Sequence, residues 1–226
     1  MQLAKNHIDV GLFTNNAEAM LAFWQDEIGL PYEELLKVGG GAQQHRHGMN
    51  GSVFKLNAAR DPLPAGAPSG YRLLAIARAG VSGVTTWFDP DDNIVSLVPP
   101  GFRETVGIAV DVFVRDEAAF HDFYGRVMEL EPAGPNAYRC GESLLRFQRD
   151  ASAARCGDLS GTGYRYITIQ VRDVDLEHAG LLARGAEEGR PPMTLGTTAR
   201  ISFIRDPDGN WIEISQRASL TGPLEG

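Results

Sequence analysis

The sequence has few cysteines and lacks the features of several large protein classes. Only Cys140 and Cys156 occur among its 226 residues, and their spacing fits no metal motif, so we expect free thiols and a cytoplasmic protein. No apolar run approaches the length of a membrane-spanning helix, and the N-terminal segment has no apolar core of a signal peptide. The net charge is −8 and no Lys/Arg run occurs. Neither nucleic acid nor a membrane is therefore expected as a partner.

The signatures of several common catalytic sites are also missing. The glycines of GGGAQQ (39–44) open no predicted helix and are followed by no Lys-Ser/Thr pair, so no phosphate-binding loop is predicted. There is no G-x-S-x-G elbow, and neither cysteine has a histidine partner nearby in the sequence. Chemistry that depends on these motifs is not expected.

The chain does contain an internal repeat. Four pairs of segments share a pattern: DVGLFTNNAEAMLAFW (9–24) with AVDVFVRDEAAFHDFY (109–124), GSVFKLN (51–57) with ESLLRFQ (142–148), GYRLLAIAR (70–78) with GYRYITIQV (163–171), and FDPDDNIVSLV (88–98) with RDPDGNWIEIS (205–215). The first pair is an alternating strand, a polar cap and a helix with an apolar stripe. The repeat predicts four units of strands and helix in two similar halves, with the second unit lacking its helix.

The strand–cap–helix segments at 9–24 and 109–124 and the closing DPDGNWIEIS (206–215) resemble the vicinal oxygen chelate superfamily. This superfamily includes glyoxalase I, extradiol dioxygenases, fosfomycin resistance proteins and bleomycin-binding proteins. The resemblance implies an α+β fold in which βαβββ units form curved mixed sheets, each a cup that binds a ligand on its concave face. We expect a first glyoxalase-like half over residues 1–100, a second over 101–218 and a flexible tail over 219–226. If the protein assembles, a homodimer is expected.

The resemblance also implies metal ligands at four equivalent strand positions inside a cup. The residues at these positions are Asp9, Lys55, Leu73 and Ser96 in the first half, and Ala109, Arg146, Tyr166 and Glu213 in the second. Alanine and arginine are not metal ligands, and tyrosine with glutamate is too small a set for a stable divalent site. The first-half set fails as well. We therefore expect no cofactor and no His/His/Glu metal centre.

Glu213 is the unusual residue of the closing strand. Strand alternation places the two flanking isoleucines on one face and Glu213 on the other, together with Trp211. Two interpretations stay open. Glu213 and Arg146 form a buried ion pair with no chemistry, or Glu213 is a base, Tyr166 a hydrogen-bond donor and Arg146 an anion-binding group for a carbonyl-bearing ligand. Trp211 is the candidate to stack on that ligand.

A second group of polar residues lies in the first unit. His45 and His47 are two residues apart in AQQHRHGM (42–49), so on a strand they share a face. Asp9 completes a metal site with them in one interpretation; in the other, all three are polar cup-wall residues that hydrogen-bond the ligand. Lys55 is expected as the counter-charge of Asp9. We expect these four side chains to converge on a common cavity.

Three functions fit these observations. The favoured one is an enzyme that acts on a small oxygenated compound, carbonyl-bearing or aromatic, by acid–base chemistry without the usual metal site. The second is a non-catalytic protein that sequesters a small molecule. The third is a metal-dependent dioxygenase or lyase with a rearranged site in the first half. In each case the partner is a small-molecule ligand.

Overall fold

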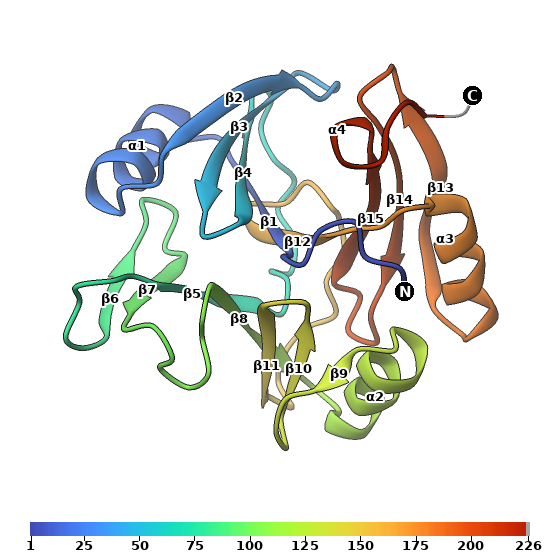
Figure 1. Ribbon diagram of the computed structural model, residues 1–226. Helices are drawn as coiled ribbons and strands as arrows, with labels where there is room; N and C mark the ends of the chain where they lie inside the picture. Colours follow the sequence, from blue (N-terminus) through green and yellow to red (C-terminus); the bar gives the residue numbers. More distant parts are fainter. Residues whose placement is uncertain (225–226) are drawn as a thin grey trace.

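The computed structural model describes residues 1–224, which form two open mixed β-sheets flanked by short helices (Figure 1). The eight-stranded sheet has the order β13-β14-β15-β12-β1-β4-β3-β2. Its strands are β1 (Asp9–Thr14), β2 (Tyr32–Lys37), β3 (Ala42–Met49), β4 (Ser52–Ala59), β12 (Gly163–Gln170), β13 (Glu187–Leu195), β14 (Ala199–Arg205) and β15 (Trp211–Arg217). In Figure 1 it curves so that β2 and β13, its two edges, lie on either side of a central space.

The seven-stranded sheet has the order β6-β7-β5-β8-β11-β10-β9. Its strands are β5 (Tyr71–Ala77), β6 (Thr85–Phe88), β7 (Ile94–Val98), β8 (Ile108–Val114), β9 (Glu131–Pro132), β10 (Ala137–Cys140) and β11 (Ser143–Arg149). The α+β class and the mixed sheets implied by the resemblance are confirmed.

The pairing of the units differs from the prediction. β1 pairs antiparallel with β12, and β5 pairs antiparallel with β8. The first unit thus shares a sheet with the fourth, and the second with the third. Each cup is built from both sequence halves, so the expectation of one cup per half is wrong. The boundary near residue 100 lies between β7 and β8 and separates the sequence repeats, but it does not separate the sheets.

Helices follow the first strand of three units, as the caps and stripes predict. They are α1 (Ala17–Ala22) continued by η1 (Phe23–Glu27), α2 (Glu117–His121) continued by η2 (Asp122–Val127), and α3 (Val174–Ala183). The second unit has none of the described helices between β5 and β6. The tail predicted to be flexible begins with a fourth short helix, α4 (Ala218–Thr221). The prediction for residues 225–226 lies outside the described residues.

The repeated DPD turns have matching geometry, which explains the sequence echo. Asp206 Oδ1 accepts hydrogen bonds from the backbone N–H groups of Asp208 and Asn210, at 3.0 and 2.8 Å. Asp89 Oδ1 accepts the equivalent bonds from residues 91 and 93. The fourth turn residue has a positive φ in both copies, 77° at Gly209 and 62° at Asp92. Each turn leads the chain into the last strand of its unit.

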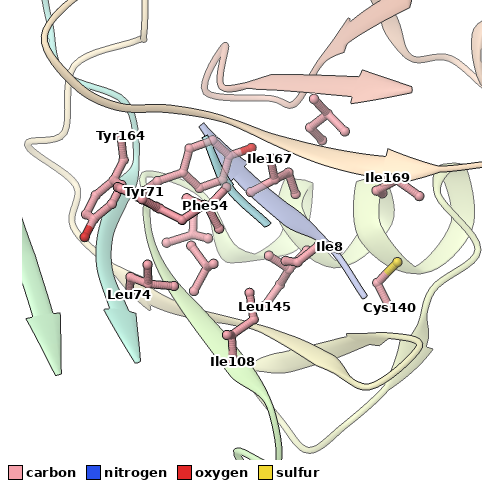
Figure 2. Packing of buried hydrophobic residues seen from close by; sticks show 14 of the residues in the cluster. Ile8, Phe54, Tyr71, Leu74, Ile108, Cys140, Leu145, Tyr164, Ile167 and Ile169 are labelled. Carbon is pink, nitrogen blue, oxygen red and sulfur yellow. The ribbon is translucent and has the colours of Figure 1, made fainter. Parts of the chain in front are cut away.

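One hydrophobic core connects the two sheets. Figure 2 shows Phe54, Ile167 and Ile169 of the eight-stranded sheet gathered with Leu74 and Leu145 of the other sheet. Ile212 and Ile214, which flank Glu213, belong to the same buried cluster. The opposite face of β15 is therefore free to carry polar groups.

Candidate functional site

A cavity of about 460 Å³ lies over the face of the eight-stranded sheet opposite this core. Strands β3, β4, β12 and β15 contribute its polar residues, while β2, β13, β14 and residues 61–64 contribute much of its wall. Glu213 lines the cavity, as strand alternation predicts. The cup that contains Glu213 therefore also contains the first unit of the chain.

Lys55, Thr168 and Glu213 form a hydrogen-bonded triangle at the base of this cavity. Lys55 Nζ lies 3.0 Å from Glu213 Oε2 and donates to Thr168 Oγ1 at 2.6 Å. The Thr168 hydroxyl in turn donates to Glu213 Oε2 at 2.9 Å. The register brings them together, because Thr168 pairs with Asp9 on one side and with Glu213 on the other. Burial lowers the pKa of Lys55, and the Glu213 and Asp9 carboxylates oppose that effect.

Asp9 has partners other than Lys55. Its Oδ1 lies 2.7 Å from Lys5 Nζ and accepts the backbone N–H of Val53 at 2.8 Å, and its Oδ2 accepts from Gln170 at 3.3 Å. Asp9 therefore acts on Lys55 through its charge, which opposes the lowering of the Lys55 pKa, while its direct contacts go to other groups. Asp9 is 1% exposed and lies below the cavity rather than in its wall.

Tyr166 lines the cavity beside the triangle, and two amides hold its hydroxyl. Gln44 Nε2 and Asn57 Nδ2 each donate to Tyr166 Oη at 3.3 Å. Because a phenol oxygen accepts two bonds and donates one, its proton remains for a third partner. Burial, with the Glu213 charge, raises the pKa of Tyr166 above its usual value. Tyr166 is thus a hydrogen-bond donor at neutral pH.

Arg146 lies in the other sheet, away from Glu213. Its Nε is 2.6 Å from Asp111 Oδ1, and its NH1 donates to Thr105 at 3.3 Å. The predicted pairing of Arg146 with Glu213 is wrong, because the two residues belong to units that form different sheets. Lys55 is the cation that pairs with Glu213.

Trp211 shares a face with Glu213 but does not line the cavity. Its indole N–H donates to the Gly157 carbonyl at 3.0 Å, and its ring packs edge-on against Phe203. The Arg205 guanidinium lies 4.9 Å from the ring centroid. Phe203, which the sequence analysis did not select, is the aromatic residue that reaches the cavity from this side.

His45 and His47 share a face of β3, as predicted, but it is not the cavity face. His47 is fully buried, lies 3.1 Å from the Gln25 amide of η1 and contacts Phe54. Burial lowers its pKa to about 4. Gln44 and Arg46, the intervening residues, line the cavity instead. The predicted convergence of both histidines with Asp9 is wrong because the strand parity is opposite to the one assumed.

The side chains at the family's ligand positions do not fit a divalent metal. In the assembled cup, strand register places Thr168 between Asp9 and Glu213. The four ligand positions are therefore Asp9, Lys55, Thr168 and Glu213, with Thr168 in place of the expected Tyr166. An ammonium group donates hydrogen bonds and has no lone pair for a metal. Across residues 1–224, no three His, Cys, Asp or Glu side chains are arranged to hold a metal ion. Lys55 Nζ is the cation that contacts Thr168 and Glu213.

Sequence reasoning missed several residues of this site. Thr168 lies opposite Asp9 on the neighbouring strand β12. It could have been found from the sequence only if the pairing of the first and fourth units had been known. Gln44 and Arg46 follow from strand parity once β3 is placed correctly. Arg190 and Arg217 carry no motif, so no sequence signal marks them.

The two mixed sheets and the cavity over one of them define a protein of the glyoxalase-like type. The family model described as Glyoxalase/Bleomycin resistance protein/Dioxygenase superfamily matches residues 6–214. The chain belongs to this superfamily, which confirms the resemblance seen in the sequence.

Solved structures share this fold at low sequence identity. Glyoxalase I from Zea mays is 14% identical, with a TM-score of 0.74 over 93% of this chain and 92% of that one. A putative dioxygenase from Bacillus subtilis subsp. subtilis str. 168 is 12% identical, with a TM-score of 0.70 over 96% and 86% of the two chains. No curated protein matches the chain significantly. Among the described residues, no helix is long and apolar enough to cross a membrane.

Proposed function

We propose that the eight-stranded cup is the active site of an enzyme that acts on a small carbonyl compound by acid–base chemistry. The observation that carries this proposal is the buried Lys55–Thr168–Glu213 triangle, which opens onto a cavity beside the Tyr166 hydroxyl. A carboxylate, an ammonium and a phenol at the base of one cavity are the groups that proton transfer next to a carbonyl requires.

The contacts within the triangle support a separate role for each group. Both polar contacts of Glu213 go to Oε2, which leaves Oε1 to take a proton from the carbon next to the carbonyl. The electron pair of that C–H bond forms a C=C bond, and the π pair of the carbonyl moves onto its oxygen. Lys55 uses two of its three N–H groups on Thr168 and Glu213, so the third is available to that oxygen. Tyr166 donates a hydrogen bond to the same oxygen and keeps its proton, and Glu213 then returns the abstracted proton to carbon as the carbonyl re-forms.

Solvent deuterium exchange tests this chemistry without a known product. The protein is incubated in D₂O with a panel of 2-hydroxy ketones and 1,2-dicarbonyl compounds, and C–H signals are followed by NMR. We expect the loss of a C–H signal with the wild type, none with Glu213→Gln, and a rate about 100-fold lower with Tyr166→Phe. Glu188→Gln on β13 is the control. Exchange that survives in Glu213→Gln contradicts the assigned base.

A non-catalytic binder is the second candidate, and one observation favours it. Gln44, Asn57, Tyr166 and Arg46 are cross-linked by hydrogen bonds of 2.9 to 3.3 Å, a rigid polar surface suited to holding a ligand. Tight binding of a panel compound with no deuterium exchange would support this candidate over the enzyme.

A further inference from the structure

The cavity has an excess of positive charge within an acidic protein. Four basic side chains line it against two carboxylates, Asp61 and Glu213, although the whole chain has a net charge of −8. Glu213 pairs with Lys55, and Asp61 pairs with Arg60 outside the cavity wall. Both lining carboxylates are therefore already neutralised, and the three arginines remain.

Two of these arginines share one carboxylate. Arg46 Nε and Arg217 NH2 lie 2.9 and 2.8 Å from the same oxygen, Oε1 of Glu34. One negative charge thus faces two guanidinium groups, which stay protonated at any ordinary pH. Burial and the neighbouring Arg46 lower the pKa of Arg217, and the Glu34, Asp9 and Glu213 carboxylates oppose that effect. This wall of the cavity lacks one negative charge.

Arg190 supplies the third guanidinium, at the opposite wall on β13. Its guanidinium carbon lies 5.8 Å from the ring centroids of Phe203 and Trp211. Arg190 is solvent-exposed, and among residues 1–224 it takes part in none of the ion pairs. Stacking on two rings orients the planar fork while leaving its N–H groups for an anion.

Much of the remaining wall is apolar, although Gln44, Asn57 and Gln170 also line it. Phe13, Leu36, Leu63, Met193, Ile201 and Phe203 line it from both edges of the sheet and from the 61–64 segment. A ligand that fills the cavity must cover this apolar surface and also satisfy the unbalanced arginines. These two demands describe one class of compound.

We propose that the ligand of this cavity is an organic anion, with a carboxylate or equivalent acid group on an aromatic or branched apolar body. The acid group lies between Arg190 and the Arg46–Arg217 pair, and the body lies against the apolar wall. This inference rests on the proposed function, since it names the substrate class of the same cup.

Two fluorescent probes with the same ring system test this class. 8-Anilinonaphthalene-1-sulfonate is an anion, and N-phenyl-1-naphthylamine is the same body without the sulfonate. We expect the anion to bind the wild type about tenfold more tightly than the neutral probe, because a hydrogen bond to a charged group is worth more than a neutral contact. Arg190→Gln and Arg217→Gln are each expected to weaken the anion about tenfold and to leave the neutral probe within about twofold. Raised salt weakens only the anion.

Two control variants locate the effect. Arg200→Gln removes the same charge from the same sheet outside the cavity, and we expect no change for either probe. Ala59→Trp fills the cavity and is expected to abolish binding of both probes. Equal affinity for the two probes, or equal effects of Arg190→Gln on both, overturns the anion class while leaving the cavity as a site. Binding unaffected by Ala59→Trp places the probes elsewhere and overturns the site itself.

Discussion

Lys55 and Glu213 are both nearly buried, at 3% and 8% exposure, so each charge depends on the other. Removing one partner leaves an uncompensated charge in a poorly solvated place, whereas removing both leaves none. We expect Lys55→Met to lower the free energy of unfolding by about 3 to 5 kcal/mol, and Lys55→Met with Glu213→Gln to cost less than the sum of the single changes. Urea unfolding at pH 7 measures all three variants.

The exposed pair Arg60–Asp61 is the matched control for this cycle. Both side chains are more than half exposed, so the same cycle there is expected to show little or no coupling, because solvent screens the two charges. Additive effects at Lys55 and Glu213 would mean that the two charges do not interact, and the acid–base role of Glu213 would lose its support.

We expect the side chain at position 55 to determine whether the cup can bind a metal. Lys55→Glu replaces the ammonium by a carboxylate between Thr168 and Glu213, above Asp9. Three carboxylates and a hydroxyl are oxygen ligands suited to Mn²⁺ or Mg²⁺. We expect calorimetry to show one Mn²⁺ bound per Lys55→Glu chain and none for Lys55→Gln. No binding by Lys55→Glu would show that Lys55 does not lie at a latent metal position.

For single residues, the sequence predicted which face of a strand a side chain lies on better than it predicted which residue that side chain contacts. Glu213 was placed on the cavity face because strand alternation is a local property of β15. Its partner was misassigned to Arg146, because pairing depends on which units share a sheet, and both Lys55 and Arg146 occupy the same position of the repeat. Local pattern contains no information that distinguishes these two cations.

At the scale of elements, the packing of β1 against β12 depends on the lack of a side chain at Gly11. A Cβ there would lie 2.1 Å from Cε1 of the Tyr166 ring, so Gly11→Ala forces the ring to move and separates its hydroxyl from Gln44 and Asn57. We expect a loss of about 1 to 3 kcal/mol in unfolding free energy and weaker ligand binding. Thermal unfolding and probe titration measure both effects.

Two comparisons isolate the cause. Once Tyr166 is replaced by alanine, Gly11→Ala is expected to cost little more, since the clash is gone. Gly66→Ala, where no atom lies within 4 Å of the added methyl group, is expected to change stability by less than about 1 kcal/mol. A full cost of Gly11→Ala in the Tyr166→Ala background would contradict this explanation.

His47, on the side of β3 that faces η1, predicts that the stability of the protein depends on pH. The pKa of His47 is about 4 in the folded protein against 6.5 in the unfolded chain. The unfolded state therefore binds the proton first, and stability is lost as pH falls from 6.5 towards 4, by up to about 3 kcal/mol. His47→Phe removes this titrating group, so its stability is expected to fall less over the same range. If urea unfolding gave parallel pH profiles for the wild type and His47→Phe, His47 would be ruled out as the cause.

Helices and strands were predicted well where the hydrophobic pattern of the sequence is periodic. They were predicted less well where the buried face depends on which other elements pack against them. The repeated strands follow from alternation, and the helical segments after β1, β8 and β12 follow from apolar stripes. The parity of β3 was wrong because His45 and His47 are as polar as Gln44 and Arg46, so composition does not identify the buried face. Only the packing of His47 against η1 decides it.

At the scale of the whole molecule, the sequence repeat and the folded units divide the chain differently. The halves 1–100 and 101–218 contain matching segments, yet every sheet combines strands from both. Further contacts join them. Gly70 N–H donates to the Asn210 side chain at 2.5 Å, and Tyr71 donates to the Trp211 carbonyl at 3.1 Å. The single core of Figure 2 also includes residues from each half.

This arrangement predicts the behaviour of the two halves as separate chains. Residues 1–100 alone lack β12 for β1 and β8 for β5, so two strand edges and much of the core face water. Such edges favour aggregation over folding. We expect neither 1–100 nor 101–226 to show a cooperative unfolding transition alone, and a refolded equimolar mixture to recover one, followed by circular dichroism. Sheets that form within each half would instead allow each fragment to unfold cooperatively on its own. Only the first outcome agrees with a cup whose Lys55 and Glu213 come from opposite ends of the chain, because neither fragment then contains a complete site.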